Sequence, residues 1–211
     1  MRLVILSDTH GLHNLIDTVP DGDVLIHAGD MTGRGTLEDL EEFLNWFGAL
    51  PHRNKLLVAG NHDWMFERQP TLAEALVPSE ITYLRDAGVS IHGIKFWGSP
   101  WQPWFNDWAF NLLRGAEIAT KWALIPEDVN VLITHGPPHG ILDEVLRPPG
   151  KHHGCEALAE RLVSLPELRL HAFGHIHEAY GTLSEGECRF VNASICDFQY
   201  APVNAPVVVD I

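Results

Sequence analysis

Apolar runs of strand length recur along the chain and outline its secondary structure. Seven of them, rich in β-branched residues, predict strands at residues 3–6, 24–28, 56–59, 94–97, 131–134, 170–173 and 207–210. A helical period of apolar positions over residues 36–50, with Thr36 as N-cap and Gly48 near the end, predicts an amphipathic helix. Two more helices are expected at residues 115–124 and 155–165.

The order of these elements predicts the fold class. Strands and helices alternate in the first half of the chain, which favours parallel pairing. In the last third, closely spaced strands surround a turn at Gly186, which favours antiparallel pairing. We therefore expect an α/β sandwich with mixed sheets. A single domain over residues 1–211 is expected, because no linker, low-complexity run or repeat divides the chain.

Polar clusters follow five of the strand-like runs directly. They are SDTHG at 7–11, HAGDMTGRG at 27–35, VAGNHD at 58–63, LITHGPP at 132–138 and FGHIH at 173–177. Binding crevices in α/β sheets form beyond the carboxyl ends of strands, so all five clusters lie where a site is expected. One such cluster is more often an ordinary polar turn. Five together, each supplying oxygen or imidazole groups, indicate a metal site.

Two of the clusters carry paired ligand types. Asp8 and His10 are two residues apart, and so are His175 and His177. Residues two apart in an extended chain point to the same side. Each pair is therefore expected to enter one common region beyond its strand.

The charge balance limits the classes of partner. Lys and Arg number 14 against 28 Asp and Glu, for a net charge of −14, which argues against a nucleic-acid polymer as the main partner. No run approaches the ~18 apolar residues of a membrane span. The three cysteines lack C-x-x-C spacing, so we expect a reducing cytoplasm. Nothing in the sequence indicates an oligomeric state.

The motif set D-x-H, G-D, G-N-H-D, H and G-H-x-H resembles that of the calcineurin-like metallophosphoesterases. Longer stretches resemble the metallophosphoesterase-domain-containing family, which is sometimes grouped with class III cyclic nucleotide phosphodiesterases; they are GSPWQPWFNDWAFNLLRG at 98–115, ITHGPPHG at 133–140, FGHIHEAYG at 173–181 and VNASICDFQYAPVNAPVVVDI at 191–211. The likeness runs from Arg2 to Ile211. It implies a four-layer αββα sandwich of two mixed β-sheets flanked by helices.

The resemblance also implies a binuclear metal site with assignable ligands. The first ion would be held by Asp8, His10, Asp30 and His177. The second would be held by Asn61, His135 and His175, with Asp30 bridging both. Nitrogen and oxygen ligands without thiolate suit two divalent transition-metal ions, manganese first, with iron, zinc, nickel or cobalt as alternatives.

The implied function is a metal-dependent phosphodiesterase that hydrolyses small phosphodiesters, either cyclic or linear nucleotides. A metal-bridging hydroxide would attack phosphorus. His62 would then be the general acid beside the leaving group, oriented by Asp63. Two alternatives stay open: a phosphomonoesterase or protein phosphatase, and a catalytically weak binding scaffold on the same fold.

Three further residues are candidates for substrate contact. Arg34 lies four residues after Asp30, as an Arg does in phosphoprotein phosphatases of the same superfamily, and would suit a phosphate oxygen. His139 follows His135 by four residues. Trp104 belongs to an aromatic group that either packs or forms a wall for a nucleobase: Trp97, Trp101, Trp104, Phe105 and Trp108.

Overall fold

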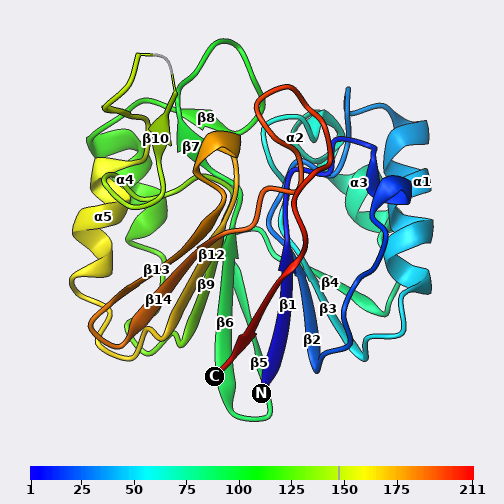
Figure 1. The fold of residues 1–211 in the computed structure, drawn as a ribbon, viewed down its shortest axis with the longest axis horizontal. Helices are drawn as coiled ribbons and strands as arrows, with labels where there is room; N and C mark the ends of the chain where they lie inside the picture. Colours follow the sequence, from blue (N-terminus) through cyan, green and yellow to red (C-terminus); the bar gives the residue numbers. More distant parts are fainter. Residues whose placement is uncertain (147) are drawn as a thin grey trace.

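Two mixed β-sheets face each other in the middle of the molecule, and helices cover the outer face of each sheet (Figure 1). This arrangement comes from a computed structural model that describes residues 1–146 and 148–211. The four layers confirm the α/β sandwich that the sequence and its resemblance led us to expect. None of the helices formed by these residues has the length and apolar character to cross a membrane.

The first sheet has the strand order β15-β1-β2-β3-β4. Its strands are β1 (Arg2–Leu6), β2 (Val24–His27), β3 (Asn54–Leu57), β4 (Ile81–Tyr83) and β15 (Val207–Asp210). The first four are parallel, with Leu3 opposite Val24, as the alternation of strand and helix predicted. β15 closes the sheet antiparallel to β1 and brings the two chain termini together.

The second sheet has the order β13-β14-β12-β9-β6-β5. Its strands are β5 (Ala87–Ile91), β6 (Ile94–Ser99), β9 (Val131–Thr134), β12 (Leu170–Phe173), β13 (Gly181–Glu185) and β14 (Cys188–Asn192). The four inner strands are parallel, and the two edge strands pair antiparallel. The hairpin β13–β14 turns at Gly186, as predicted. Two small ribbons are added by β7 (Gln102–Pro103), β8 (Asn111–Leu112), β10 (Glu144–Val145) and β11 (Lys151–His152).

In the described part of the chain, five α-helices form the outer layers. The first sheet is covered by α1 (Leu37–Ala49), α2 (Trp64–Arg68) and α3 (Pro70–Leu76), and the second by α4 (Ala116–Trp122) and α5 (Glu156–Leu162). The three predicted helices are all present. Thr36 caps α1 by accepting from the Asp39 N–H at 3.1 Å, while the Asp39 carboxylate reaches back to the Thr36 N–H.

Alternation along the strands divides the core into layers. Leu3 and Ile5 of β1 point between the two sheets, whereas Val4 and Leu6 point to the layer of α1. All four side chains are fully buried. The parallel strands of both sheets run in the same direction, so their carboxyl ends meet at one edge, at the top of Figure 1. The polar clusters that follow these strands are thereby collected at that edge.

Two buried histidines make the fold sensitive to acid. The Nδ1 of His27 accepts the Gly29 N–H at 3.3 Å, and its Nε2 lies 3.1 Å from the Thr9 hydroxyl. His171 on β12 donates from Nε2 to the Thr134 hydroxyl at 2.8 Å. Burial lowers the pKa of each imidazole to about 3, so both are neutral in the folded chain.

Unfolding below neutral pH is therefore expected to take up protons. In the unfolded chain both imidazoles titrate near pH 6.5, so their contribution to stability is complete above that value and falls as the pH drops below it. Each should lose roughly 2 kcal/mol between pH 7 and pH 5. Urea unfolding of metal-free protein at both pH values measures this loss. The loss should shrink in His171→Gln but not in His92→Gln, which alters an exposed turn; equal losses in both variants would contradict the expectation.

Candidate metal centre

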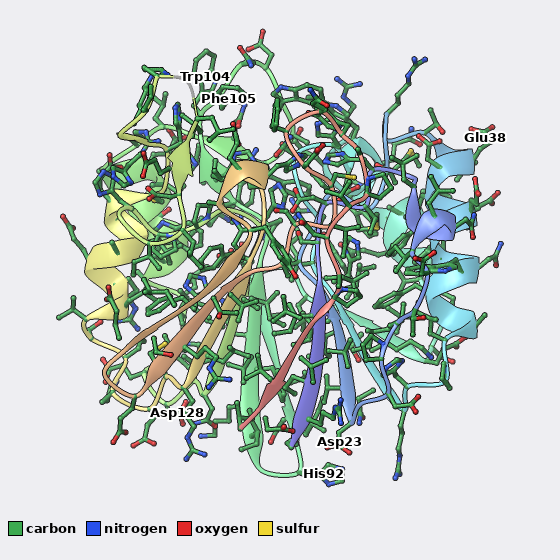
Figure 2. All side chains as sticks on the ribbon, in the orientation of Figure 1. Asp23, Glu38, His92, Trp104, Phe105 and Asp128 are labelled. Atoms are coloured by element: carbon green, nitrogen blue, oxygen red, sulfur yellow. The ribbon has the colours of Figure 1, made fainter. Side chains whose placement is uncertain are left out.

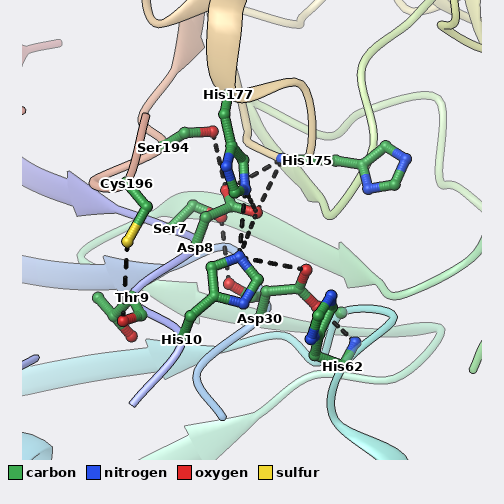
Figure 3. Close-up of polar contacts among 12 residues, drawn as sticks. Ser7, Asp8, Thr9, His10, Asp30, His62, His175, His177, Ser194 and Cys196 are labelled. Atoms are coloured by element: carbon green, nitrogen blue, oxygen red, sulfur yellow. Dashed lines mark hydrogen bonds and ion pairs between the residues drawn. The ribbon is translucent and has the colours of Figure 1, made fainter. Parts of the chain in front are cut away.

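Side chains that follow β1, β2, β3, β9 and β12 meet at the edge where the parallel strands terminate. Figure 3 shows Asp8, His10, Asp30, His62, His175 and His177 of this group. Ligand atoms of Asp8, His10 and His177 lie within 4.8 Å of one another, and so do those of Asp30, His135 and His175. The Asn61 Oδ1 lies 2.9 Å from the His135 Nε2. The structure thus brings together all seven residues that the resemblance implied as ligands.

Asp30 lies between the two groups of ligands. One carboxylate oxygen, Oδ2, is 3.8 Å from the His10 Nε2 and 3.4 Å from the His135 Nε2. The other, Oδ1, accepts the backbone N–H of His62 at 2.7 Å. Asp30 is therefore placed where a bridging carboxylate is required.

Backbone conformation turns several of these side chains into the shared space. The φ angles of Asp8, His10, Asp30 and His175 are 52°, 46°, 54° and 69°. This left-handed region is uncommon for residues other than glycine and costs about 1–3 kcal/mol when the surroundings enforce it. Its recurrence at four of the seven positions indicates that the strand ends are shaped for the site.

Two glycines allow the backbone to approach the carboxylates closely. A Cβ at Gly60 would overlap the Asp30 Oδ1, and a Cβ at Gly174 would overlap the Asp8 Oδ2. Asp8 is fully buried and accepts hydrogen bonds from the Ser194 hydroxyl at 2.9 Å and from the His175 N–H at 3.0 Å. Close backbone contact and hydrogen bonds thus fix the positions of both carboxylates.

Hydrogen bonds to main-chain carbonyls fix two of the imidazole tautomers. The Nδ1 of His135 donates to the Ala28 carbonyl at 3.1 Å, and the Nδ1 of His177 donates to the Asp197 carbonyl at 2.9 Å. In the neutral rings Nε2 then carries a lone pair. The His177 Nε2 faces the Asp8 carboxylate at 3.4 Å. Metal ligands in proteins are arranged in this way, with nitrogen lone pairs and carboxylate oxygens directed into one buried space. The donor set therefore fits two cations.

The charges of the ligand set lead to the same conclusion. Burial alone would raise the pKa of both aspartates, but His177 and His135 outweigh it and hold the pKa of Asp8 and Asp30 below the ordinary value. Burial alone would lower the pKa of both histidines. Asp30 instead raises the pKa of His135 to about 9, and Asp8 raises the pKa of His177 to about 9. Two buried carboxylates therefore require compensating positive charge.

His62 stands beside the ligand set with its ring fixed on two sides. The imidazole stacks on Trp108, with ring centroids 4.2 Å apart and planes inclined by 19°. Its Nδ1 donates to the Gly33 carbonyl at 2.9 Å. The ring also lies 4.5 Å from the His10 ring, edge to face. Because the Nδ1 proton is held by the Gly33 carbonyl, Nε2 is the ring atom that remains for proton exchange with a ligand.

Asp63 acts on the loop rather than on the ring of His62. Its carboxylate accepts from the Gly60 N–H at 2.7 Å, the Thr32 N–H at 3.0 Å and the Thr32 hydroxyl at 2.8 Å. Burial and the nearby charge of Asp30 raise the pKa of Asp63 to about 6. We expected Asp63 to orient the His62 imidazole, but its carboxylate instead stabilises the 60–63 turn. The ring of His62 is oriented by Gly33 and Trp108.

Comparison with known proteins identifies the family. The family model described as calcineurin-like phosphoesterase matches residues 1–179. Metallophosphoesterase domain-containing protein 1 of Homo sapiens is 43% identical over 234 residues, which cover 100% of this chain and 71% of that protein. The chain belongs to the calcineurin-like metallophosphoesterases. Its histidine and aspartate clusters are those of a binuclear metal site of the type found in this family of hydrolases.

Two further comparisons show similarity over nearly the whole chain. A UPF0046 protein of Caenorhabditis elegans is 35% identical over 228 residues, which cover 100% of this metallophosphoesterase and 81% of the relative. A solved crystal structure with 18% sequence identity superposes on this chain with a TM-score of 0.70. The match covers 94% of this chain and 91% of the solved chain. At that identity the superposition shows the fold alone.

Three residues were proposed for substrate contact. In the described part of the chain, none of them lines the cleft over the metal centre. Arg34 is exposed on the loop after Asp30. His139 is exposed, and its ring lies 5.5 Å from that of His152. Trp104 is exposed at the same edge as the metal centre (Figure 2) and lines a neighbouring cavity that includes His175. Their roles stay predictions, and Trp104 is the one that shares a cavity with a candidate metal ligand.

The aromatic group of the sequence divides between packing and the cleft. Trp101 packs inward and donates from Nε1 to the Asp86 carboxylate at 2.9 Å. Phe105 and Trp108 instead line the cleft over the metal centre. The lining of the same cleft also includes three residues that sequence reasoning missed: Glu178, Phe198 and Tyr200. Their only signal was their position within the FGHIHEAYG and VNASICDFQYAPVNAPVVVDI stretches.

Proposed function

We propose that this metallophosphoesterase is a phosphodiesterase that hydrolyses small phosphodiesters, such as cyclic or linear nucleotides, with two divalent transition-metal ions, manganese first. The cleft over the ligand set supports this choice. Its floor is formed by Asp30, Asn61, His62, His175 and His177, and its sides are largely aromatic.

The charge of the cleft is the observation that carries the proposal. Within residues 1–146 and 148–211, the cleft lining includes no lysine or arginine, and Glu178 adds a carboxylate at the side. Asp8 and Asp30 would offset two of the four positive charges of two divalent ions, and the hydroxide nucleophile would offset a third, which would leave about one positive charge for the substrate. A phosphodiester carries one negative charge, whereas a phosphomonoester carries about 1.5 to 2 at pH 7. The limited positive charge therefore favours the diester.

The chain itself supplies orientation and a proton. Metal ions bound by the seven residues would polarise the phosphoryl oxygens and acidify a water molecule. His62 holds its Nδ1 proton on the Gly33 carbonyl and presents Nε2 to the cleft, where it would donate a proton to the leaving oxygen. The stacked Trp108 holds the ring in this orientation.

Turnover of matched nitrophenyl esters tests this proposal. Protein stripped of metal and reloaded with Mn²⁺ should hydrolyse bis-p-nitrophenyl phosphate with a kcat/KM about tenfold or more above that for p-nitrophenyl phosphate, since one uncompensated charge costs on the order of 1.4 kcal/mol. Reloading with Zn²⁺, Ni²⁺, Fe²⁺ or Co²⁺ tests the preference for manganese. A 2′,3′-cyclic, 3′,5′-cyclic and linear dinucleotide series then defines the substrate.

The opposite ranking would identify a phosphomonoesterase. Full metal loading without hydrolysis of any of these phosphodiesters would instead favour a binding scaffold. Either outcome would overturn the proposed function.

A further inference from the structure

Two aromatic walls enclose the cleft above the metal centre. One wall consists of Phe105 and Trp108, from the segment between β7 and β8. The other consists of Phe198 and Tyr200, from the loop that precedes β15. These two segments are about 90 residues apart in the sequence, yet they rise side by side at the top of Figure 1. The cleft therefore combines the candidate metal ligands with aromatic rings, and Glu178 adds one carboxylate to its lining.

Tyr200 is the wall residue closest to the ligand set. Its ring centroid lies 4.8 Å from that of His10 and 5.2 Å from that of His177, both edge to face, and 6.1 Å from that of His62. The side chain is nevertheless 50% exposed. Tyr200 thus touches the site with one part of its ring and presents the remainder to the cleft.

The backbone holds Tyr200 in this position at a cost. Its φ angle is 60°, which is a rare conformation for a bulky residue. The loop is braced by Asp197, whose carboxylate accepts the N–H groups of Gln199 and Ala201, each at 2.9 Å. The Asp197 carbonyl accepts both the Tyr200 N–H and the His177 Nδ1–H, each at 2.9 Å. One carbonyl therefore fixes Tyr200 relative to a metal-ligand histidine.

Exposed aromatic surface beside a polar floor defines the chemistry of a ligand. Phe105 and Phe198 are 47% and 54% exposed, so three of the four wall rings keep about half of their surface in solvent. A planar aromatic group placed between the walls would cover this surface while its phosphate rests on the floor. An alkyl ester of the same phosphate would cover much less of it.

We infer that Tyr200 is a specificity-determining residue that contacts the substrate and selects phosphodiesters bearing a planar aromatic group, such as a nucleobase or an aryl ester. This inference rests on the proposed function and narrows its substrate class. We assign the contact to the ring, because the ring is the part that lies against His10 and His177.

A pair of phosphinates measures this selectivity without turnover. Dimethylphosphinate and methyl(phenyl)phosphinate are both monoanions with P–C bonds that the enzyme cannot hydrolyse. They differ in that a phenyl ring replaces one methyl group. Calorimetric titration into the Mn²⁺-loaded full chain should give about tenfold tighter binding of the phenyl compound, as expected for one aromatic contact. Tyr200→Gly removes the ring and also relieves the left-handed backbone, so the loop should keep its shape.

We expect Tyr200→Gly to lose most of the phenyl preference while binding dimethylphosphinate and two metal ions as the unmodified chain does. Tyr200→Phe should retain the preference, and so should Val203→Ala, a matched change at an exposed position of the same loop. Equal affinities for the two phosphinates in the unmodified chain, or a preference that survives Tyr200→Gly, would overturn the inference. Parallel weakening of both phosphinates with loss of metal would also overturn it, because Tyr200 would then be a structural support.

The two proposals can fail separately. Phosphinate binding does not depend on diesterase activity, so absence of diester hydrolysis with an intact phenyl preference would remove the proposed function alone. Loss of the phenyl preference with intact diester hydrolysis would remove only the role of Tyr200.

Discussion

Replacing His62 with alanine should lower kcat for phosphodiesters with alkyl leaving groups by about 10²–10⁴-fold, the range typical of general acid catalysis. The same change should cost much less with a nitrophenyl leaving group, because nitrophenolate departs without a proton. The structural reason is the fixed Nδ1–H hydrogen bond to Gly33, which leaves Nε2 to serve the leaving oxygen. Steady-state kinetics on both types of diester measures the difference.

Metal content separates the acid role of His62 from a ligand role. A ligand atom of His62 lies within 4.8 Å of those of His10 and Asp30, so the residue is also spaced as a metal ligand would be. As an acid, His62→Ala should retain two ions per chain. The control is His92→Ala, which changes an exposed histidine in the turn between β5 and β6 and should not separate the two leaving groups. Equal losses on both leaving groups would rule out the acid role.

Asp30→Asn is expected to have the largest effect on metal binding. Asp30 is a carboxylate ligand candidate for both ions, with Oδ2 within 3.8 Å of His10 and 3.4 Å of His135. The amide removes one negative charge from a buried space, so the affinity for both ions should fall by more than about 100-fold, beyond the loss typical of altering groups that only orient ligands. Metal analysis after gel filtration measures this, together with kcat/KM.

Asp128→Asn provides the control for a change of charge alone. Asp128 is exposed at the opposite edge of the molecule (Figure 2), where it pairs with Lys95. This variant should keep two ions and full activity. Far-ultraviolet circular dichroism establishes that Asp30→Asn is folded. A folded Asp30→Asn variant that still retains two tightly bound ions would contradict the bridging role.

The central strands of both sheets and the ligand set were predictable for the same physical reason, whereas short strands such as β4 and β5 were not predicted. Strands with buried faces show as apolar runs, and the residues after a parallel strand necessarily lie at the carboxyl edge of the sheet. The sequence therefore indicated that Asp8, Asp30, Asn61, His135 and His175 would converge, and the structure brings them together. The left-handed φ values that aim several of them carried no sequence signal, since Asp and His tolerate that region without glycine.

Local details that depend on loop packing were not predictable. Helices α2 and α3 were missed because each is short and Pro70 starts the second, so residues 64–76 show no long helical period. The contacts of Asp63 depend on how the 60–63 turn folds against Thr32. Tyr200 reaches the cleft only because β15 returns beside β1 and carries the preceding loop over the site.

Anomalous diffraction from crystals of the Mn²⁺-loaded chain tests the central claim most directly. We expect two manganese peaks ~3.5–4 Å apart, as in other two-metal sites, one beside Asp8, His10 and His177 and the other beside Asn61, His135 and His175. Asp30 should lie between them. A single peak under saturating manganese, or peaks away from these residues, would contradict a binuclear centre built by this ligand set.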